Sequence, residues 1–222
     1  MKKRCLLSLL LFAIVLFHLS CGKPQPEVEQ PHPPTRGDPE KLARVLASRE
    51  QENPPPLTVL EAYQIAQERA TEWNEESHLT YMSDLGGLRY ISFYFAVYNP
   101  YGGSSCERKR SDYETLMMEI DRTSGEVLSC SSGFGIGTYG RLDPNDWPID
   151  SPQALEIADA AGGAAFKEKH PGWSASIWAN GIGECWEVCI GVPGDLRTRP
   201  AIFFKIDPYT GETRVEEENL NK

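Results

Sequence analysis

The chain has 222 residues, and its 22 basic residues are outnumbered by 32 acidic ones, which gives a formal net charge of −10. This balance favours solubility and argues against nucleic acid or an anionic lipid surface as a partner. The length allows one or two domains.

The first 22 residues predict export from the cytoplasm. Residues 2–4 are basic and precede an apolar run, Leu6 to Phe17, that is shorter than a membrane span. The run leads into Leu19-Ser20-Cys21-Gly22, which resembles the lipobox of bacterial lipoproteins, although His18 stands where an aliphatic residue is usual. We therefore expect a signal peptide at residues 1–20 and a lipid on Cys21, with an ordinary cleaved signal as the alternative.

The predicted lipid anchor sets the compartment. It would hold the protein in the cell envelope, and the membrane would be reached through the N-terminal lipid alone. Because Gly22 is not acidic, the same resemblance favours the outer membrane, at its periplasmic face or at the cell surface, if the source is diderm. Without the signal, 19 basic residues face 32 acidic ones, a formal charge of −13.

Four cysteines remain after the signal and the lipid site, and disulfides persist in an exported protein. They are Cys106, Cys130, Cys185 and Cys189. Cys185 and Cys189 lie in a strand-like run, where about 13 Å separates their Cα atoms, whereas a disulfide needs about 7 Å or less. We expect each of these two to pair elsewhere or to stay reduced. A zinc site is disfavoured because no CxxC motif or histidine pair accompanies the cysteines.

A proline-rich tether is expected at residues 21–56, which contain nine of the 17 prolines. This composition favours extended backbone, with about 3 Å of reach per residue. Within the tether, Asp38-Pro39 has the pattern of a helix start, with aspartate as the cap and proline in the first turn. Leu42, Val45 and Leu46 would share one face of a short amphipathic helix over residues 38–50. We expect this helix to dock on the folded part, with docking on a partner protein as the alternative.

From Leu57 onward the chain contains two copies of one pattern, which we place at residues 57–130 and 149–222, and each copy opens with a helix. In the first copy, Thr58-Val59-Leu60-Glu61 is a capping box, and apolar residues recur at helical spacing up to Trp73. In the second copy, Asp150-Ser151-Pro152-Gln153 begins a helix. Gly162-Gly163 interrupts this helix, since a glycine costs about 1 kcal/mol in a helix interior.

Each helix is followed by an alternating strand. In the first copy, the apolar residues at 91, 93, 95 and 97 alternate with tyrosines and small residues. In the second copy, Trp186, Val188 and Ile190 alternate with Cys185, Glu187 and Cys189. Aligning the copies on Pro100 and Pro193 puts Phe93 over Trp186 and Phe95 over Val188, which predicts a shared inner face.

Each copy ends in a β-hairpin with the same turn residues, Ile120-Asp121…Gly125-Glu126 and Ile206-Asp207…Gly211-Glu212. The aspartate opens the turn by bonding the backbone ahead of it, and the glycine supplies the positive φ that closes it. The duplication predicts an α+β fold of two tandem repeats, each a helix packed on a small antiparallel sheet that ends in a β-hairpin. Residues 131–148, with their glycines and aspartates, are expected to be a flexible linker between the repeats.

The doubled pattern resembles the PepSY domain family, small α+β modules in which a helix packs on an antiparallel sheet. The resemblance rests on Ala62 to Ala66 and Ala154 to Ala158 in the helices, together with the two hairpins. It covers roughly residues 57–130 and 149–216. The aromatic-rich first strand and the long loop after it are not typical. The resemblance implies non-catalytic modules that occur in peptidase propeptides and envelope proteins, where regulation of secreted peptidases is the proposed role.

The sequence contains no convincing catalytic or metal-binding constellation. His78 and His170 each follow a helix, where a basic side chain suits the helix end. The residues from Gly135 to Gly140 match the dinucleotide fingerprint, but the aspartates and prolines after them cannot form the helix that such a site needs. The oxygens of Asp143, Asn145 and Asp146 lack the spacing of a calcium loop. We therefore expect no enzymatic activity, no cofactor and no metal.

Two features favour a binding surface. Tyr90, Tyr94 and Tyr98 lie on the strand face opposite the expected core, and tyrosine is favoured where one side of a residue is apolar and the other is wet. Arg108, Lys109 and Arg110 form a basic cluster in the loop that follows this strand. The alternative is that the other copy covers the tyrosines and that the loop is only solvated.

The expected function is that of a lipid-anchored, non-catalytic envelope module that binds another envelope or secreted protein and inhibits or regulates a secreted peptidase. The alternative is a structural or assembly lipoprotein of the envelope, which would bind through the helix at residues 38–50.

Overall fold

The computed structural model describes residues 37–98, 113–134, 140–193 and 199–216. The predicted signal peptide, Cys21, Cys106 and the basic cluster Arg108-Lys109-Arg110 lie outside these ranges. Contacts group residues Pro34–Lys222 into one compact unit. Among the described helices, none combines the length and the apolar character that crossing a membrane requires.

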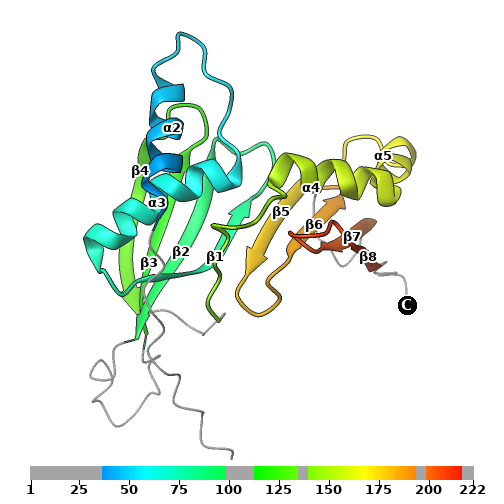
Figure 1. Ribbon diagram of the computed structural model, residues 1–222. Helices are drawn as coiled ribbons and strands as arrows, with labels where there is room; N and C mark the ends of the chain where they lie inside the picture. The colour runs from blue at the N-terminus through cyan, green and yellow to red at the C-terminus, as the bar shows by residue number, and fades with distance from the viewer. Residues whose placement is uncertain (1–36, 99–112, 135–139, 194–198, 217–222) are drawn as a thin grey trace, which may run out of the picture. The chain divides into compact units, whose positions relative to one another are not determined.

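Helices precede each of two sets of four strands along the chain (Figure 1). The helical segments are α2 (Pro39–Arg49), α3 (Val59–Trp73), α4 (Ser151–Ala158), the π-helical turn η1 (Asp159–Gly163) and α5 (Ala164–Lys169). The strands of the first half are β1 (His78–Asp84), β2 (Tyr90–Tyr98), β3 (Tyr113–Asp121) and β4 (Val127–Phe134). Those of the second half are β5 (Ser174–Asn180), β6 (Trp186–Gly191), β7 (Ala201–Ile206) and β8 (Thr213–Glu216).

All eight strands belong to one antiparallel sheet, in the order β4-β3-β2-β1-β5-β6-β7-β8. The two halves meet where β1 pairs with β5, from Tyr81 opposite Asn180 to Asp84 opposite Ile177. The α+β class is thus confirmed, but the expectation of a separate small sheet in each half is wrong. The physical reason is that β1 and β5 would each be an unpaired edge, and pairing them satisfies the backbone groups of both.

The core lies between the sheet and the helices on one of its faces. Phe93 and Phe95 of β2 and Trp186 and Val188 of β6 are all fully buried, which confirms the inner face expected from their alternation. The helix α3 covers β1, β2 and β3, and α4 covers β6 and β7. The opposite face of the sheet carries no described helix (Figure 1).

The two hairpins close with nearly the same geometry. The amide of Gly125 donates to the carbonyl of Asp121 at 2.9 Å, and the amide of Gly211 donates to the carbonyl of Asp207 at 2.9 Å. The glycines have φ values of +76° and +74°, in the left-handed region that glycine adopts without strain. The turn chemistry expected from the two sequences is therefore confirmed in both hairpins.

The helix starts also follow the sequence. Thr58 and Glu61 form the complete capping box of α3. Asp150 caps α4, and the Oδ1 atom accepts from the amide of Ser151 at 2.6 Å. In the second half the helix is kinked at η1, where Gly162 has a φ of +132°. The interruption expected at Gly162-Gly163 is therefore a π-turn, after which α5 continues.

The helix α2 packs on α3, so the second part of the expected tether belongs to the folded unit. Asp38 caps this helix as expected, Val45 is buried, and Leu42 packs against the core. The guanidinium of Arg49 at the other end of α2 donates to the carbonyls of Pro55 at 2.6 Å and Thr123 at 3.2 Å. Docking in cis, the favoured of the two expectations, is what the structure has.

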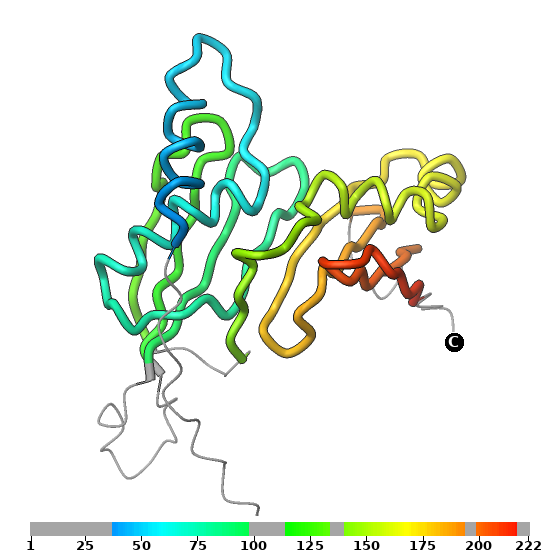
Figure 2. The backbone as a smooth tube through the Cα atoms, in the orientation of Figure 1, coloured from blue at the N-terminus to red at the C-terminus, as the bar shows by residue number. Residues whose placement is uncertain are grey.

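The expectation of a flexible linker at residues 131–148 is wrong for its described part. Residues 131–134 continue β4, and Leu142 and Trp147 are buried in the core. The amide of Leu142 donates to the carbonyl of Leu79 at 2.8 Å, and Trp147 meets Trp186 edge to face, with ring centroids 5.2 Å apart. Figure 2 shows residues 140–148 in light green, where they lead into α4. The burial of Leu142 and Trp147 therefore packs this segment against the core, although most of the neighbouring residues in the sequence are polar.

Candidate functional site

The helix-free face of the sheet is the face that carries the predicted tyrosines. On β2 the side chains of Tyr90 and Tyr94 lie opposite to the buried Ile91 and Phe93, as the alternation predicts. Tyr94 is 37% exposed, and Tyr90 is half-buried. Two of the three predicted tyrosines are therefore available on this face.

The remaining residues of the predicted surface cannot be placed. Tyr98 is the last residue of β2 and pairs with Tyr113 through the backbone, but its side chain lies outside the described part. The same holds for the whole of Arg108, Lys109 and Arg110. The combination of tyrosines with a basic loop therefore stays a prediction.

Tyr81 completes an aromatic pair with Tyr94. The two residues are register partners in the β1–β2 ladder, and their rings meet edge to face with centroids 5.5 Å apart. Edge-to-face packing is a favoured arrangement of two aromatic rings and stabilises this pair. On the other side of Tyr94, its register partner on β3 is the half-buried Met117. We call Tyr81, Tyr94 and Met117 the aromatic row.

The helix-free face continues across the junction into the second half. Trp178 of β5 is the register partner of Ser83 on β1, so it lies on the same face. The indole Nε1 of Trp178 donates to Glu187 Oε2 at 3.1 Å, and the amide of the Asn180 side chain donates to Glu187 Oε1 at 3.2 Å. A carboxylate fixed by two donors and a half-buried indole thus stand beside the aromatic row. The face offers both apolar area and oriented polar groups, as protein-binding surfaces do.

Sequence reasoning missed Tyr81, Met117 and Trp178. The ladder of β1 has a register shift between Leu79 and Tyr81, so alternation along this strand does not show which face Tyr81 takes. Trp178 and Met117 do alternate with buried neighbours, Ile177 and Met118. That alternation is the signal that could have found them.

The cysteines occupy three different environments. Cys130 is exposed on β4, Cys185 is half-buried just before β6, and Cys189 is buried on β6. No disulfide joins these three, and pairing with Cys106 falls outside the described residues. Burial and, second, the charge of Glu187 raise the pKa of the Cys185 thiol, so this side chain is a neutral thiol at pH 7 and a poor nucleophile.

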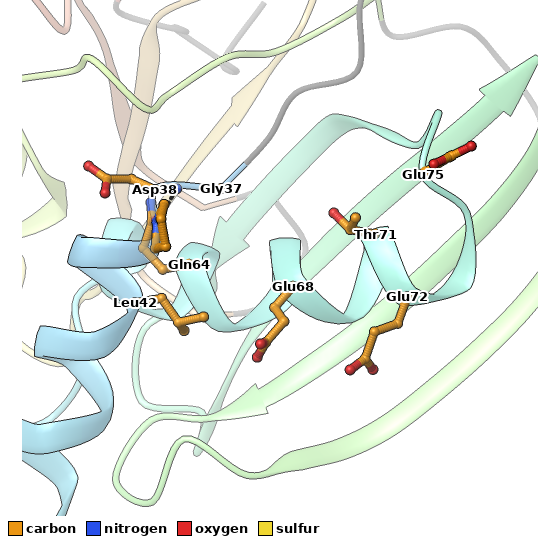
Figure 3. Close-up of a pocket in the computed structure, with 9 residues that line it drawn as sticks. Gly37, Asp38, Leu42, Gln64, Glu68, Thr71, Glu72 and Glu75 are labelled. Atoms are coloured by element: carbon orange, nitrogen blue, oxygen red, sulfur yellow. Dashed lines mark hydrogen bonds between the residues drawn. The ribbon is translucent and has the colours of Figure 1, made fainter.

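A groove of about 670 Å³ runs between the start of α2 and α3 (Figure 3). Leu42 supplies an apolar wall, and the carboxylates of Glu68 and Glu72 project together from one side of α3. Gln64 closes one end, where its Oε1 accepts from the amide of Asp38 at 3.3 Å. Glu72 is also bound by Arg69 at 2.8 Å. The groove is open and acidic, so its chemistry suits a basic side chain.

Within the described ranges, no cluster of three or more histidine, cysteine or carboxylate side chains is arranged to hold a metal ion. Asp143 Oδ1 instead accepts from the side chain of Asn145 at 3.1 Å and from its backbone amide at 3.3 Å. These bonds form a local turn, and they direct the oxygen of Asp143 inward to the loop itself.

Comparisons with known proteins give little beyond this geometry. No family model matches the chain, and no curated protein matches it. One crystal structure, described as a "putative lipoprotein" from Clostridium difficile 630, aligns over 77% of this chain and 97% of its own. The sequence identity is 17% and the TM-score is 0.45, which does not establish a shared fold.

Proposed function

We propose that this chain is a lipid-anchored, non-catalytic envelope protein that binds another protein through the helix-free face of its sheet. The observation that carries the proposal is the partly exposed aromatic pair of Tyr81 and Tyr94, packed edge to face beside Trp178 and Glu187. Rigid aromatic anchors that lose little conformational freedom on binding are what interfaces favour.

The two halves are, in this proposal, copies of one PepSY-like module. This duplication is supported by the order of helix and four strands, which is the same in both halves, and by the matched hairpins. In each turn the aspartate Oδ1 accepts two backbone amides at 2.7 to 2.9 Å, from Thr123 and Ser124 in the first half and from Tyr209 and Thr210 in the second. The strand order is also mirrored about the β1–β5 junction.

The partner is, in this proposal, a secreted peptidase that the module restrains. The support is the resemblance of the sequence to the PepSY family, together with the predicted export signal, because a protein exported in this way would share a compartment with secreted peptidases. A binding face that spans both halves would also explain why the halves are joined in one sheet, because the junction places Trp178 next to Ser83.

The test is a capture experiment on envelope extract with Pro34–Lys222 as bait. Tyr94→Ser removes the exposed ring of the aromatic row, and Tyr209→Ser is the matched control, because Tyr209 is 57% exposed but lies in the second hairpin turn. We expect a peptidase retained by the wild type and by Tyr209→Ser, with retention reduced about tenfold or more by Tyr94→Ser. The activity of that peptidase should fall when the wild-type protein is added. If Tyr94→Ser retained the peptidase as strongly as Tyr209→Ser and the wild type do, the helix-free face would be excluded as the binding site.

A structural or assembly role is the second candidate. The observation that favours it is Leu46, which projects from α2 and is exposed although Leu42 and Val45 of the same helix are packed. In this case the captured protein would be an envelope assembly component rather than a peptidase. Its retention would be lost with Leu46→Ser and kept with Tyr94→Ser.

A further inference from the structure

The sheet ends in two edge strands of very different character. The edges are β4 and β8, and within the described ranges no strand pairs with the outer side of either one. An edge strand presents a row of backbone donors and acceptors that another strand can use. Proteins therefore protect their edge strands with charged residues, with prolines or by keeping the strand short. The strands β4 and β8 differ in these features.

The edge at β8 is protected. This strand has only four residues, Thr213–Glu216, and two of them are charged and exposed, Arg214 and Glu216. Glu216 is further held by Lys205 on the neighbouring strand at 3.0 Å. A second strand placed here would meet charges over half of its length, so β8 is poorly suited to pairing.

Among the described residues, no such device protects the edge at β4. This strand has eight residues, VLSCSSGF, with no charged residue and no proline. Its pairing with β3 is regular from Ser129 to Phe134, and the register shift of the ladder lies before this run. The residues from Cys130 to Gly133 are all exposed. Within the described residues, a regular, uncharged and accessible edge strand thus lies at one end of the sheet and not at the other.

We propose that β4 pairs antiparallel with β4 of a second copy of this chain, around a two-fold axis between Cys130 and Ser132. The inference rests on the sheet alone and is independent of the proposed function. A two-fold axis brings the middle of a strand against itself, so a charged residue at or beside the axis would lie close to its own copy; β4 has no charged residue. The axis stands perpendicular to the sheet and keeps the helices of both copies on one side, which joins the two sheets edge to edge.

The register of the pair is restricted by the side-chain faces. Paired residues in an antiparallel ladder point to the same face, and residues 130 and 131 point to opposite faces. The axis therefore passes through one residue and not between two. If it passes through Cys130, the two Cys130 residues lie directly opposite, with Cα atoms about 4.5 to 5.5 Å apart, within the range of a disulfide.

The association is expected to be weak. At most seven residues of β4 (Val127–Phe134) pair in this way. Such an edge pairing buries less than the roughly 1,200 Å² of a standard interface, which places the pair among transient complexes. Confinement of both copies to one membrane, under the proposed lipid anchor, would raise their effective concentration. A soluble unit should therefore dimerise only at high concentration.

The first test is sedimentation velocity of Pro34–Lys222 up to about 1 mM, a concentration that reveals weak complexes. We expect a monomer–dimer equilibrium that Ser131→Lys weakens at least tenfold, because the two lysines then lie at the axis or one residue from it. Val215→Lys places the same charge on β8 and should leave the equilibrium unchanged. Thermal melting of each variant establishes that it is folded. A wild type that stays monomeric throughout would overturn the proposal.

The second test maps the axis. Single cysteines at 130, 131 or 132, in a background in which every other cysteine of the unit is replaced by serine or alanine, are treated with a copper–phenanthroline oxidant, which takes two electrons from a thiol pair. We expect one of the three to form a disulfide-linked dimer at least tenfold faster than the other two, since neighbouring positions are too far apart. Equal, slow crosslinking at all three would overturn the β4 pairing even if a dimer exists. The proposal would also be overturned if β4 of the wild-type protein paired with a foreign extended peptide and not with β4 of a second copy.

Discussion

The hydroxyl of Ser151 accepts a hydrogen bond from the backbone amide of Val59 at 3.0 Å, so the first residue of α4 caps the first residue of α3. Asp150 Oδ1 accepts from the next amide, that of Leu60, at 3.1 Å. The first amides of a helix have no partner within the helix. Here a residue of the second half provides that partner for the helix of the first, and the two helix starts hold the halves together above the sheet.

Replacing the Ser151 hydroxyl should destabilise the whole unit. Ser151→Ala leaves the amide of Val59 buried without an acceptor, and the cost is about 1–2 kcal/mol in the free energy of unfolding. Urea unfolding followed by far-UV circular dichroism measures it. The control is Gln153→Ala, an exposed position in the same turn of α4, which should change the stability by less than about 0.5 kcal/mol. Equal effects of the two variants would mean that the bond between the helices contributes nothing.

Two adjacent glycines in the turn between β1 and β2 should respond very differently to alanine. Both have positive φ, +49° at Gly86 and +79° at Gly87, so each alanine suffers backbone strain of about 1–2 kcal/mol. At Gly86 the added Cβ would also lie 1.6 Å from the carbonyl oxygen of Ala175 on β5, whereas at Gly87 it would meet nothing within 4 Å. We expect Gly86→Ala to lose more than about 3 kcal/mol in urea unfolding, because it separates the two halves at their junction.

Gly87→Ala is therefore the control for strain alone. The difference between the two variants isolates the contact between the turn and β5. If both variants lost the same stability, the turn would not be packed against Ala175.

Local patterns predicted the helix starts and the turns of this fold. Thr58 with Glu61, Asp38 with Pro39, and the aspartate–glycine pairs of the hairpins each bond within a few residues of themselves, so the sequence alone contains the interaction. The inner faces of β2 and β6 could be predicted for the same reason, since strict alternation along one strand fixes which side is buried.

The junction between the halves could not be predicted in this way. The pairing of β1 with β5 joins residues almost a hundred positions apart, and the shift between Leu79 and Tyr81 breaks the alternation that would have marked β1. The contact of Tyr81 with Tyr94 depends on the register of β1, so it could not be predicted without that register. Leu142 and Trp147 were missed because their neighbours are turn residues, which mark a loop but do not show whether it is packed.

The connecting segment should prove essential to stability. Trp147→Ala removes a ring that is 6% exposed and that packs edge to face on Trp186, so we expect a loss of about 3–5 kcal/mol in chemical unfolding. Trp173→Ala is the control, because Trp173 is 40% exposed and contacts the ammonium of Lys167 at the surface. Its cost should be below about 1 kcal/mol. A Trp147→Ala variant as stable as the wild type would restore the flexible linker that the structure contradicts.

The first hairpin should make the stability of the unit depend on pH in acid. Burial alone would raise the pKa of Asp121, but hydrogen bonds from the amide of Ser124, the guanidinium of Arg89 and the amide of Thr123 lower it to about 2. The unfolded chain binds a proton near the ordinary pKa of 3.8. The stabilisation by the Asp121 carboxylate is therefore complete above pH 4 and is lost as the pH falls towards 2. The urea midpoint, measured at pH 6, 4, 3 and 2, should decrease most between pH 4 and pH 2.

Asp121→Asn tests the origin of that loss. The amide keeps an oxygen for the turn but cannot ionise, so the variant should be less stable at pH 6 and should lose less stability than the wild type between pH 4 and pH 2. Asp207→Asn makes the same change in the second hairpin, where the amides of Thr210 and Tyr209 also lower the pKa. Asp121 is only 1% exposed and accepts from the guanidinium of Arg89 as well as from the amides of its turn, whereas Asp207 is half-buried and accepts from the amides of Tyr209 and Thr210. The loss of stability in acid should therefore respond more to Asp121→Asn than to Asp207→Asn. An acid profile that is unchanged by Asp121→Asn would place the responsible carboxylate elsewhere.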